Sequence, residues 1–128
     1  ILNVGSTAGY QPGPFMSTYY ATKAHVNSFS RALNGELRGT GVSCTLLAPG
    51  ATATEFAQSA SLEGSRLFKM QVTATAESVA RDGYRAMFKR KTIVVSGFMN
   101  WLMTLLVPRL PVCLVTRLAG YLNNAVAK

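Results

Sequence analysis

Acidic residues and histidine are scarce in this chain. The 128 residues include five aspartates and glutamates together and one histidine, against 13 lysines and arginines. Zinc and similar ions are held by clusters of histidine, cysteine and acidic side chains, and no such cluster occurs, so we predict no metal site. The net charge of +8 would suit an anionic partner. Because no nucleic-acid-binding motif accompanies this charge, we expect no nucleic-acid partner.

Cysteine is also rare. Cys44 and Cys113 lie far apart, and Cys44 falls within an apolar run. Two thiols without a regular spacing are typical of free core cysteines in a reducing compartment, rather than of a disulfide or a metal site. The pattern therefore indicates a cytoplasmic location.

No apolar run is long enough to cross a membrane without interruption. A spanning helix needs about twenty apolar residues, and the run that begins near Trp101 is broken by Pro108, Arg109 and Pro111. A spanning helix is therefore disfavoured. Two interpretations of residues 98–128 stay open: helices that lie at a membrane surface with Trp101 and the arginines at the boundary, or a cover over a pocket or a subunit contact.

The residues that are present predict an α/β fold. Residues 1–5 indicate a central strand buried on both faces, and residues 7–18 indicate a loop rich in glycine and proline. A helix is expected from residue 17 or 18 to residue 38, closed by Gly39. Its core stripe is expected to comprise Val26, Phe29, Leu33 and Leu37.

The pattern continues with a strand over residues 42–48, a helix over 75–89 and a strand over 92–95. Thr75 is the expected N-cap of this helix, and its core positions are expected to be Val79, Ala80, Tyr84 and Met87. A strand, a long helix and a second strand favour a right-handed crossover onto a parallel sheet.

Three polar residues stand at a spacing that suits proton transfer. Tyr19 and Lys23 are four residues apart, so on a helix they lie on one face. We expect the ammonium of Lys23 to lower the pKa of the phenol, because a tyrosine with an ordinary pKa of about 10 transfers protons poorly near neutrality. Ser6, thirteen residues before Tyr19, stands where it can hydrogen-bond a carbonyl oxygen beside the tyrosine.

This interval, the Tyr-x-x-x-Lys pattern at 19–23 and the preceding segment Asn3-Val4-Gly5-Ser6-Thr7-Ala8-Gly9 together resemble the short-chain dehydrogenase/reductase family. The resemblance implies a Rossmann-like, doubly wound parallel sheet, and reversible interconversion of a carbonyl and an alcohol with NAD or NADP. It implies that Tyr19 exchanges a proton with the substrate and that Ser6 orients the reacting oxygen. Tyr19 and Lys23 are also implied to contact the cofactor, with Lys23 on the nicotinamide ribose.

A third motif, Pro49-Gly50-Ala51-Thr52-Ala53-Thr54, follows the second strand. It resembles the family segment whose backbone and threonine hydroxyl hold the nicotinamide carboxamide. Glycine lets a backbone approach a flat ring, and a short hydroxyl can bond an amide. The resemblance makes Pro49, Gly50, Thr52 and Thr54 candidate cofactor-binding residues. Residues 55–74 are expected to form a variable lid over the substrate.

Family members have a glycine-rich strand-turn-helix that binds the cofactor pyrophosphate, and these 128 residues contain none. We therefore expect residues 1–97 to be the C-terminal half of a Rossmann-fold oxidoreductase domain. Residues 98–128 are expected to form an apolar, proline-interrupted helical extension. On this interpretation the isolated fragment is inactive.

The sequence also bears on the substrate and the partners. The segment from Gly5 to Pro14 and the Thr-Glu-Phe at 54–56 look most like a bacterial branch related to long-chain 3-oxoacyl and hydroxysteroid reductases, which favours a lipid-like or acyl substrate. Small residues on the long helix, Ala24, Ser28 and Ala32, allow either a homo-oligomer contact or packing against another helix. The competing hypothesis is a non-catalytic binding or membrane-associated module of the same fold.

Overall fold

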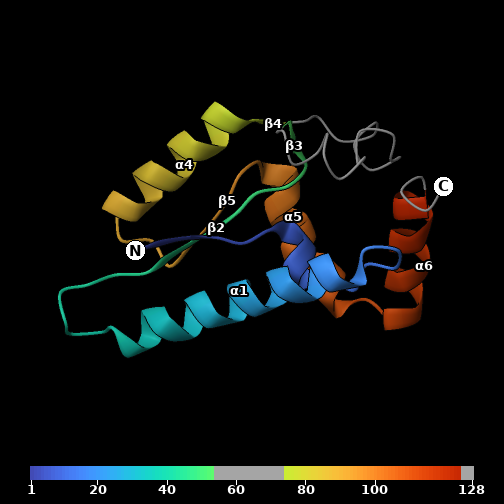
Figure 1. Ribbon diagram of the computed structural model, residues 1–128, viewed down its shortest axis with the longest axis horizontal. Helices are drawn as coiled ribbons and strands as arrows, with labels where there is room; N and C mark the ends of the chain where they lie inside the picture. The colour runs from blue at the N-terminus through green and yellow to red at the C-terminus, as the bar shows by residue number, and fades with distance from the viewer. Residues whose placement is uncertain (54–73, 125–128) are drawn as a thin grey trace.

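A computed structural model describes residues 1–53 and 74–124 and shows a parallel sheet between helices (Figure 1). Within these residues, strands β1 (Leu2–Val4), β2 (Thr45–Ala48) and β5 (Ile93–Val95) pair in the order β1-β2-β5, all parallel. Helices α1 (Ser17–Glu36) and α4 (Ala76–Phe88) cover opposite faces of this sheet. The predicted α/β class with a parallel sheet is confirmed.

The core is centred on β2, whose four residues are at most 3% exposed. The expectation that β1 is buried on both faces is wrong, since Ile1 and Val4 are 52% and 53% exposed. The physical reason is that β1 pairs with β2 alone in the described part of the chain, which leaves its other edge without a neighbouring strand.

The predicted loop over residues 7–18 contains a short 3-10 helix, η1 (Thr7–Tyr10). This turn forms because the Ser6 hydroxyl accepts a hydrogen bond from the backbone N–H of Ala8. Helix α1 then begins at Ser17 as predicted and ends at Glu36, two residues before the expected end. Gly39 follows in the left-handed region, with φ of 82°.

The inner face of α1 is more polar than the sequence pattern predicted. Its buried residues are Tyr20, Asn27 and Ser30, whereas Phe29 is 53% exposed. Ser30 accepts a hydrogen bond from Asn3 of β1 at 3.0 Å. Because polar groups of β1 and of the following turn face this helix, its polar residues turn inward. Ala24, Ser28 and Ala32 are exposed, and the expectation of an oligomer contact there stays a prediction.

Helix α4 confirms the predicted N-cap, because the hydroxyl of Thr75 accepts a hydrogen bond from the backbone N–H of Ser78 at 3.2 Å. Its buried residues are Val79, Gly83 and Ala86, and the placement of Tyr84 in the core is wrong because that residue is 60% exposed. Ala80 is exposed and Met87 half-buried. A Cβ at Gly83 would lie 2.7 Å from the Leu47 side chain, so this glycine lets α4 approach the sheet closely.

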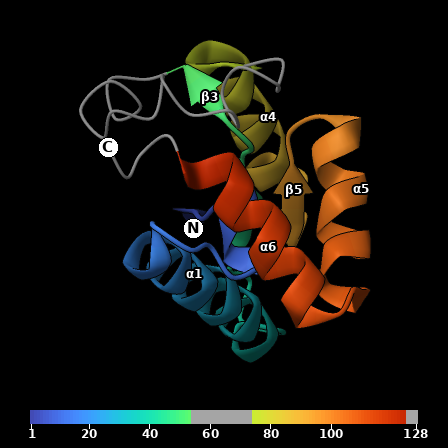
Figure 2. The same ribbon diagram turned by 90° about the vertical axis from the view of Figure 1, so that its right-hand side faces the viewer.

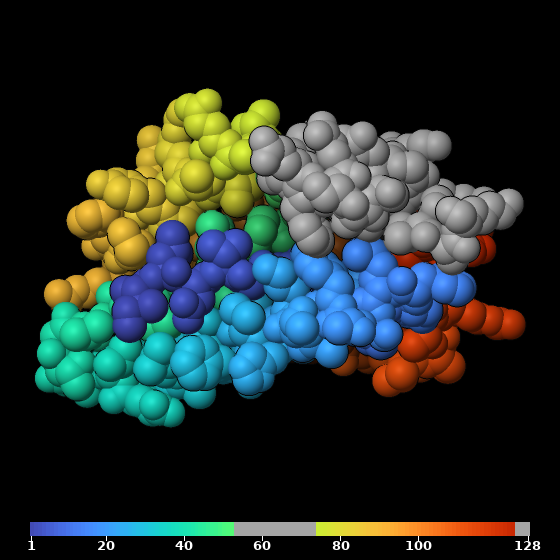
Figure 3. All heavy atoms as spheres, in the orientation of Figure 1, coloured from blue at the N-terminus to red at the C-terminus, as the bar shows by residue number. Residues whose placement is uncertain are grey.

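The C-terminal segment forms α5 (Phe98–Leu106), η3 (Val107–Arg109) and α6 (Val112–Asn123). Helix α6 lies in front of the carboxyl ends of the strands, with α1 on one side and α5 on the other (Figure 2). Atoms of α6 lie beside the loop that precedes α1 (Figure 3). Among the described residues, no helix has both the length and the apolar character needed to span a membrane.

Strands β3 (Thr52–Ala53) and β4 (Ala74–Thr75) form a second, small parallel pair.

Both cysteines are free, as predicted. Cys44 is buried in the core, but Cys113 is exposed on α6, which corrects the expectation that both are core residues.

Candidate active site

Ser6 lies directly after β1, at the carboxyl edge of the sheet. Its backbone is extended, with φ of −169°, and the residue is 7% exposed. The hydroxyl accepts from the Ala8 N–H at 3.1 Å and makes a long contact of 3.5 Å, as donor, with the carbonyl of Pro49. The side chain is therefore held between the turn after β1 and the loop after β2.

Tyr19 and Lys23 project from the first turns of α1 toward Ser6. The Lys23 ammonium lies 5.8 Å from the centre of the Tyr19 ring and donates a hydrogen bond to the carbonyl of Val4 at 3.2 Å. Ser6 and Tyr19 line the same cavity, where the Ser6 side chain is close enough to act on the pKa of the phenol. The structure thus brings together the three residues that the sequence singled out.

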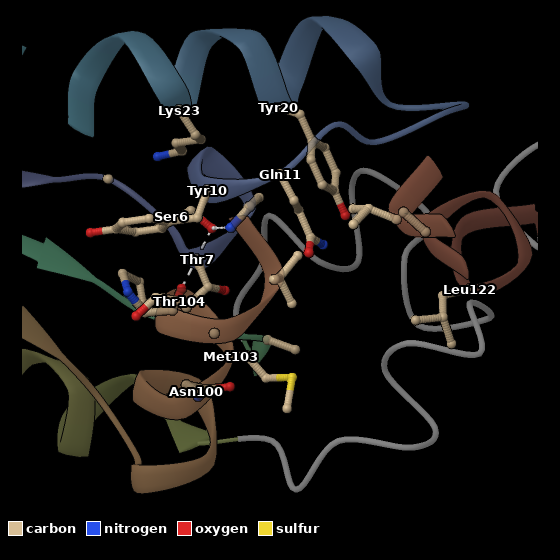
Figure 4. A pocket seen from close by; sticks show the side chains of 18 of the residues that line it. Ser6, Thr7, Tyr10, Gln11, Tyr20, Lys23, Asn100, Met103, Thr104 and Leu122 are labelled. Atoms are coloured by element: carbon tan, nitrogen blue, oxygen red, sulfur yellow. Dashed lines mark hydrogen bonds between the residues drawn. The ribbon is translucent and has the colours of Figure 1, made fainter. Parts of the chain in front are cut away.

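A cavity of about 540 Å³ is lined by these three residues and by the loop after β2 (Figure 4). Pro49, Gly50 and Thr52 belong to its wall. The Thr52 hydroxyl donates to the carbonyl of Gly50 at 3.0 Å, which braces the loop. Thr54 and residues 55–73 of the expected lid lie outside the described part of the chain.

Gly50 has a packing role that the sequence did not indicate. A Cβ at this position would lie 2.4 Å from the side-chain nitrogen of Asn100 on α5. That nitrogen donates to the carbonyl of Ser96 at 2.8 Å, so it is fixed in place. Glycine at position 50 is therefore required by the close approach of α5, whatever else the loop contacts.

The pKa of Tyr19 is raised above its ordinary value, chiefly by burial, while the hydrogen bond from Ser6 acts to lower it and the neighbouring Tyr20 to raise it. The expectation that Lys23 produces a lowered pKa is wrong for this structure. Burial also lowers the pKa of Lys23, and its ammonium is directed to the carbonyl of Val4. Near neutral pH the phenol is accordingly protonated and able to donate.

Asn27 is a residue of the site region that the sequence analysis missed. It lies four residues after Lys23, and its side chain is hydrogen-bonded to the backbone of Ser6. The signal was present, because Tyr19, Lys23 and Asn27 follow one another at intervals of four and share a helix face. An asparagine at this spacing was not recognised as part of the pattern.

The rest of the cavity wall is apolar and comes from the C-terminal helices. The apolar side chains of residues 98–124 that line it are Met103, Val107, Leu110, Leu114, Val115, Leu118, Ala119 and Leu122. The hydroxyl of Thr104 and the amide of Asn100 interrupt this wall. Residues 98–124 therefore close one side of the pocket that contains Ser6 and Tyr19.

Comparison with known proteins identifies the family. The family model described as short chain dehydrogenase matches residues 1–64, which include β1, α1 and β2. The chain belongs to the short-chain dehydrogenase family. The interval between Ser6 and Tyr19 and the Tyr-x-x-x-Lys pattern lie within this match.

Curated relatives agree with this assignment. The chain is 44% identical over 89 residues to sulfoacetaldehyde reductase of Chromohalobacter salexigens, a match that covers 64% of this chain and 34% of the relative. It is 36% identical over 85 residues to 17-beta-hydroxysteroid dehydrogenase type 3 of Rattus norvegicus, covering 66% of this chain and 26% of that protein. The matched region thus spans about a third or less of each short-chain dehydrogenase relative.

A solved structure supports the Rossmann-like architecture. The short-chain dehydrogenase from Sphingobium yanoikuyae in complex with NADPH is similar with a TM-score of 0.67 and 28% identity. The match covers 77% of this chain and 37% of that chain.

Proposed function

We propose that the protein to which this chain belongs is an NAD(P)-dependent oxidoreductase that interconverts a carbonyl and an alcohol. The observation that supports this proposal is the convergence of Ser6, Tyr19 and Lys23 on one cavity. Family membership and the NADPH complex of the Sphingobium yanoikuyae enzyme support the choice of cofactor class. The selection between NAD and NADP is left open by the residues of this chain.

The residues at the carboxyl edge of the sheet fit the nicotinamide end of such a cofactor. Lys23 supplies a cation and a hydrogen-bond donor, and the loop from Pro49 to Thr52 supplies backbone groups beside the cavity. A hydroxyl and backbone amides suit a carboxamide, which both donates and accepts hydrogen bonds. When bound, the nicotinamide supplies or takes up a hydride, and the protein supplies position and electrostatics.

The proton-transfer role falls to the Tyr19 phenol. Because its pKa is raised, it holds its proton near neutral pH and can donate it to a carbonyl oxygen as negative charge develops there. The Ser6 hydroxyl lines the same cavity and can turn its single proton from the long contact with the Pro49 carbonyl to donate a hydrogen bond to the same oxygen. In the alcohol-oxidising direction the phenolate is needed, and its formation would have to be favoured by the positive charge of Lys23.

Substitution of Tyr19 tests the assignment in a full-length protein that contains this chain. Tyr19→Phe should abolish turnover and leave cofactor affinity nearly unchanged, because it removes only the transferable proton. Lys23→Ala should impair both. Tyr84→Phe, at a 60% exposed position of α4, is the matched control and should keep full activity. Equal losses of cofactor affinity in Tyr19→Phe and Lys23→Ala would contradict their separate roles.

The apolar wall supports a proposal about the substrate. A carbonyl compound with a lipid-like or acyl chain can place its polar end at Ser6 and Tyr19 and its chain against α5, η3 and α6. Leu114 lines the cavity, whereas Val112 on the same helix is 69% exposed and lies outside it. Leu114→Lys should lower kcat/KM for long-chain ketones and spare short ones, and Val112→Lys should change neither. An equal effect of Leu114→Lys on short and long substrates would exclude a chain-binding role.

A second candidate function is contact with an anionic membrane surface. The C-terminal helices expose large apolar side chains, including Phe98 at 73% and Met99 at 62%. From residue 83 onward the chain has seven lysines and arginines and no acidic residue, a combination that favours anionic lipid. The chain should float with vesicles of phosphatidylcholine and phosphatidylglycerol but not with phosphatidylcholine alone. Phe98→Glu should weaken this binding, and failure to float with either vesicle would exclude the contact.

A further inference from the structure

The amide of Asn27 holds both backbone polar groups of Ser6. Its side-chain nitrogen donates to the Ser6 carbonyl at 2.9 Å, and its side-chain oxygen accepts from the Ser6 N–H at 3.4 Å. Asn27 is 3% exposed, so these bonds are shielded from water. A buried amide that is paired at both ends restrains its partner, because breaking either bond would leave a buried polar group unsatisfied.

Two glycines leave the space that this amide occupies. A Cβ at Gly5 would lie 2.0 Å from the Asn27 side-chain oxygen, and a Cβ at Gly9 would lie 2.4 Å from its side-chain nitrogen. Both distances are far shorter than any non-bonded contact between heavy atoms. The glycines on the two sides of Ser6 therefore allow α1 to insert an asparagine against the turn.

Asn27 also links Ser6 to Tyr19 through a rigid element. Tyr19 and Asn27 lie on the same face of α1, two turns apart. The Ser6 backbone is bonded to Asn27, and the Ser6 side chain lies in the same cavity wall as Tyr19 and acts on its phenol. One helix therefore carries the proposed proton donor and also the group that fixes the position of the serine relative to that donor.

We infer that Asn27 is a positioning residue of the active site, which acts through Ser6 and keeps its hydroxyl within reach of Tyr19 and of the substrate oxygen. Asn27 is absent from the cavity lining, so it is placed to act through Ser6 and not by direct contact. The inference rests on the proposed function for its effect on turnover. Its effect on the Ser6–Tyr19 contact does not depend on that function.

The same helix supplies a matched control. Asn34 donates to the carbonyl of Cys44 at 2.6 Å, and its side-chain oxygen accepts from the hydroxyl of Thr92 at 3.2 Å. It therefore also makes two amide bonds, a part-buried one just before β2 and an exposed one just before β5, both away from the cavity. Leucine is close to asparagine in size and can make neither bond, so Asn34→Leu measures the general cost of losing such a pair.

The experiment compares Asn27→Leu and Asn27→Asp with Asn34→Leu, each alone and with Ser6→Ala, in a full-length protein that contains this chain. Asn27→Leu should lower kcat by about 10- to 100-fold, the effect of a small misplacement of a reacting group, and leave the dissociation constant of NADPH within about twofold. In the Ser6→Ala background the same change should cost little, because the two residues act as one unit. Asn27→Asp loses the donor to the Ser6 carbonyl and should lower kcat by less than Asn27→Leu does. It provides the test if Asn27→Leu does not fold.

A second readout is independent of turnover. Titration of the Tyr19 phenol should show a higher pKa in Asn27→Leu than in the wild type, because the Ser6 hydrogen bond that acts to lower it is weakened; Asn34→Leu should leave it unchanged. If the wild type lacks activity with NADH and NADPH but this pKa change occurs, the proposed function fails and the positioning role stands. The positioning role is overturned if Asn27→Leu and Asn34→Leu behave alike, or if Asn27→Leu and Ser6→Ala have fully additive effects on kcat.

Discussion

The side-chain amide of Asn123 donates a hydrogen bond to the hydroxyl of Tyr20, 103 positions earlier in the chain, at 3.3 Å. The same nitrogen donates to the carbonyl of Pro14 at 3.1 Å. Asn123 is 1% exposed and Tyr20 is 6% exposed. This cluster fixes the end of α6 against the start of α1, beside Tyr19. The apolar wall of the cavity is thus held at its end by a buried polar contact.

We expect Asn123→Ala to destabilise the fold by about 1–3 kcal/mol, because it leaves the buried Tyr20 hydroxyl and the Pro14 carbonyl without this donor. The neighbouring Asn124 is exposed, and Asn124→Ala should change stability by less than about 0.5 kcal/mol. Urea unfolding of both variants measures the difference. Equal midpoints for the two variants would show that the Asn123 contacts contribute nothing to the attachment of α6.

Glycine substitutions should have opposite signs at two positions. A Cβ at Gly13 would lie 2.4 Å from the ring of Tyr20, so Gly13→Ala forces the loop or the ring to move and should destabilise by about 1–3 kcal/mol. Gly35 lies within α1, and a Cβ there has no neighbouring atom within 4 Å. Gly35→Ala should stabilise by roughly 0.5–1 kcal/mol, because alanine favours helix. Thermal unfolding of the two variants measures these changes in stability, and a stabilising Gly13→Ala would contradict the close approach of Gly13 to the Tyr20 ring.

Stability should fall at alkaline pH because Tyr10 and Tyr19 are half-buried. Burial raises the pKa values of Tyr10 and Tyr19 above 10, so the folded state holds these protons more tightly than the unfolded state. Their contribution is complete below pH 10 and is lost as pH rises through the raised values. Lys23, whose pKa is lowered by burial, acts in the opposite direction, since the folded state gains as this lysine deprotonates.

Tyr19→Phe should therefore reduce the loss of unfolding free energy above pH 10 relative to the wild type. Tyr84→Phe, which makes the same substitution at a 60% exposed position, serves as the control. Urea unfolding between pH 8 and pH 11 measures the slopes. The same slope in Tyr19→Phe and the wild type would mean that burial of the phenol is not linked to folding.

The sequence predicted the convergence of Ser6, Tyr19 and Lys23 on one cavity better than it predicted the helix faces. Ser6, Tyr19 and Lys23 could be recognised because their spacing is fixed by a strand end and a helix turn. The exposed Phe29 and Tyr84 were assigned to the core because the periodic pattern was read from apolar residues alone. A polar inner face such as that of Asn27 and Ser30 becomes visible only when the backbone groups opposite it are placed.

The C-terminal segment was ambiguous for a different reason. Its composition suits a membrane surface, a subunit contact or a pocket wall equally well, because all three bury apolar side chains. The contacts from Asn123 to Pro14 and Tyr20 join segments more than a hundred positions apart, and no local pattern marks such a pair. The structure therefore adds the pocket wall, and the membrane contact stays a proposal.

The 128-residue chain by itself should self-associate and show no dehydrogenase activity. In the described residues β1 pairs on one edge only, and Ile1 and Val4 are more than half exposed. Strand edges with exposed apolar side chains pair readily with other chains. The chain also lacks a glycine-rich turn for the cofactor pyrophosphate, so NADPH affinity should be weak. Light scattering and NADPH titration of the purified chain test both points, and a monomer that unfolds cooperatively and binds NADPH at micromolar concentration would contradict them.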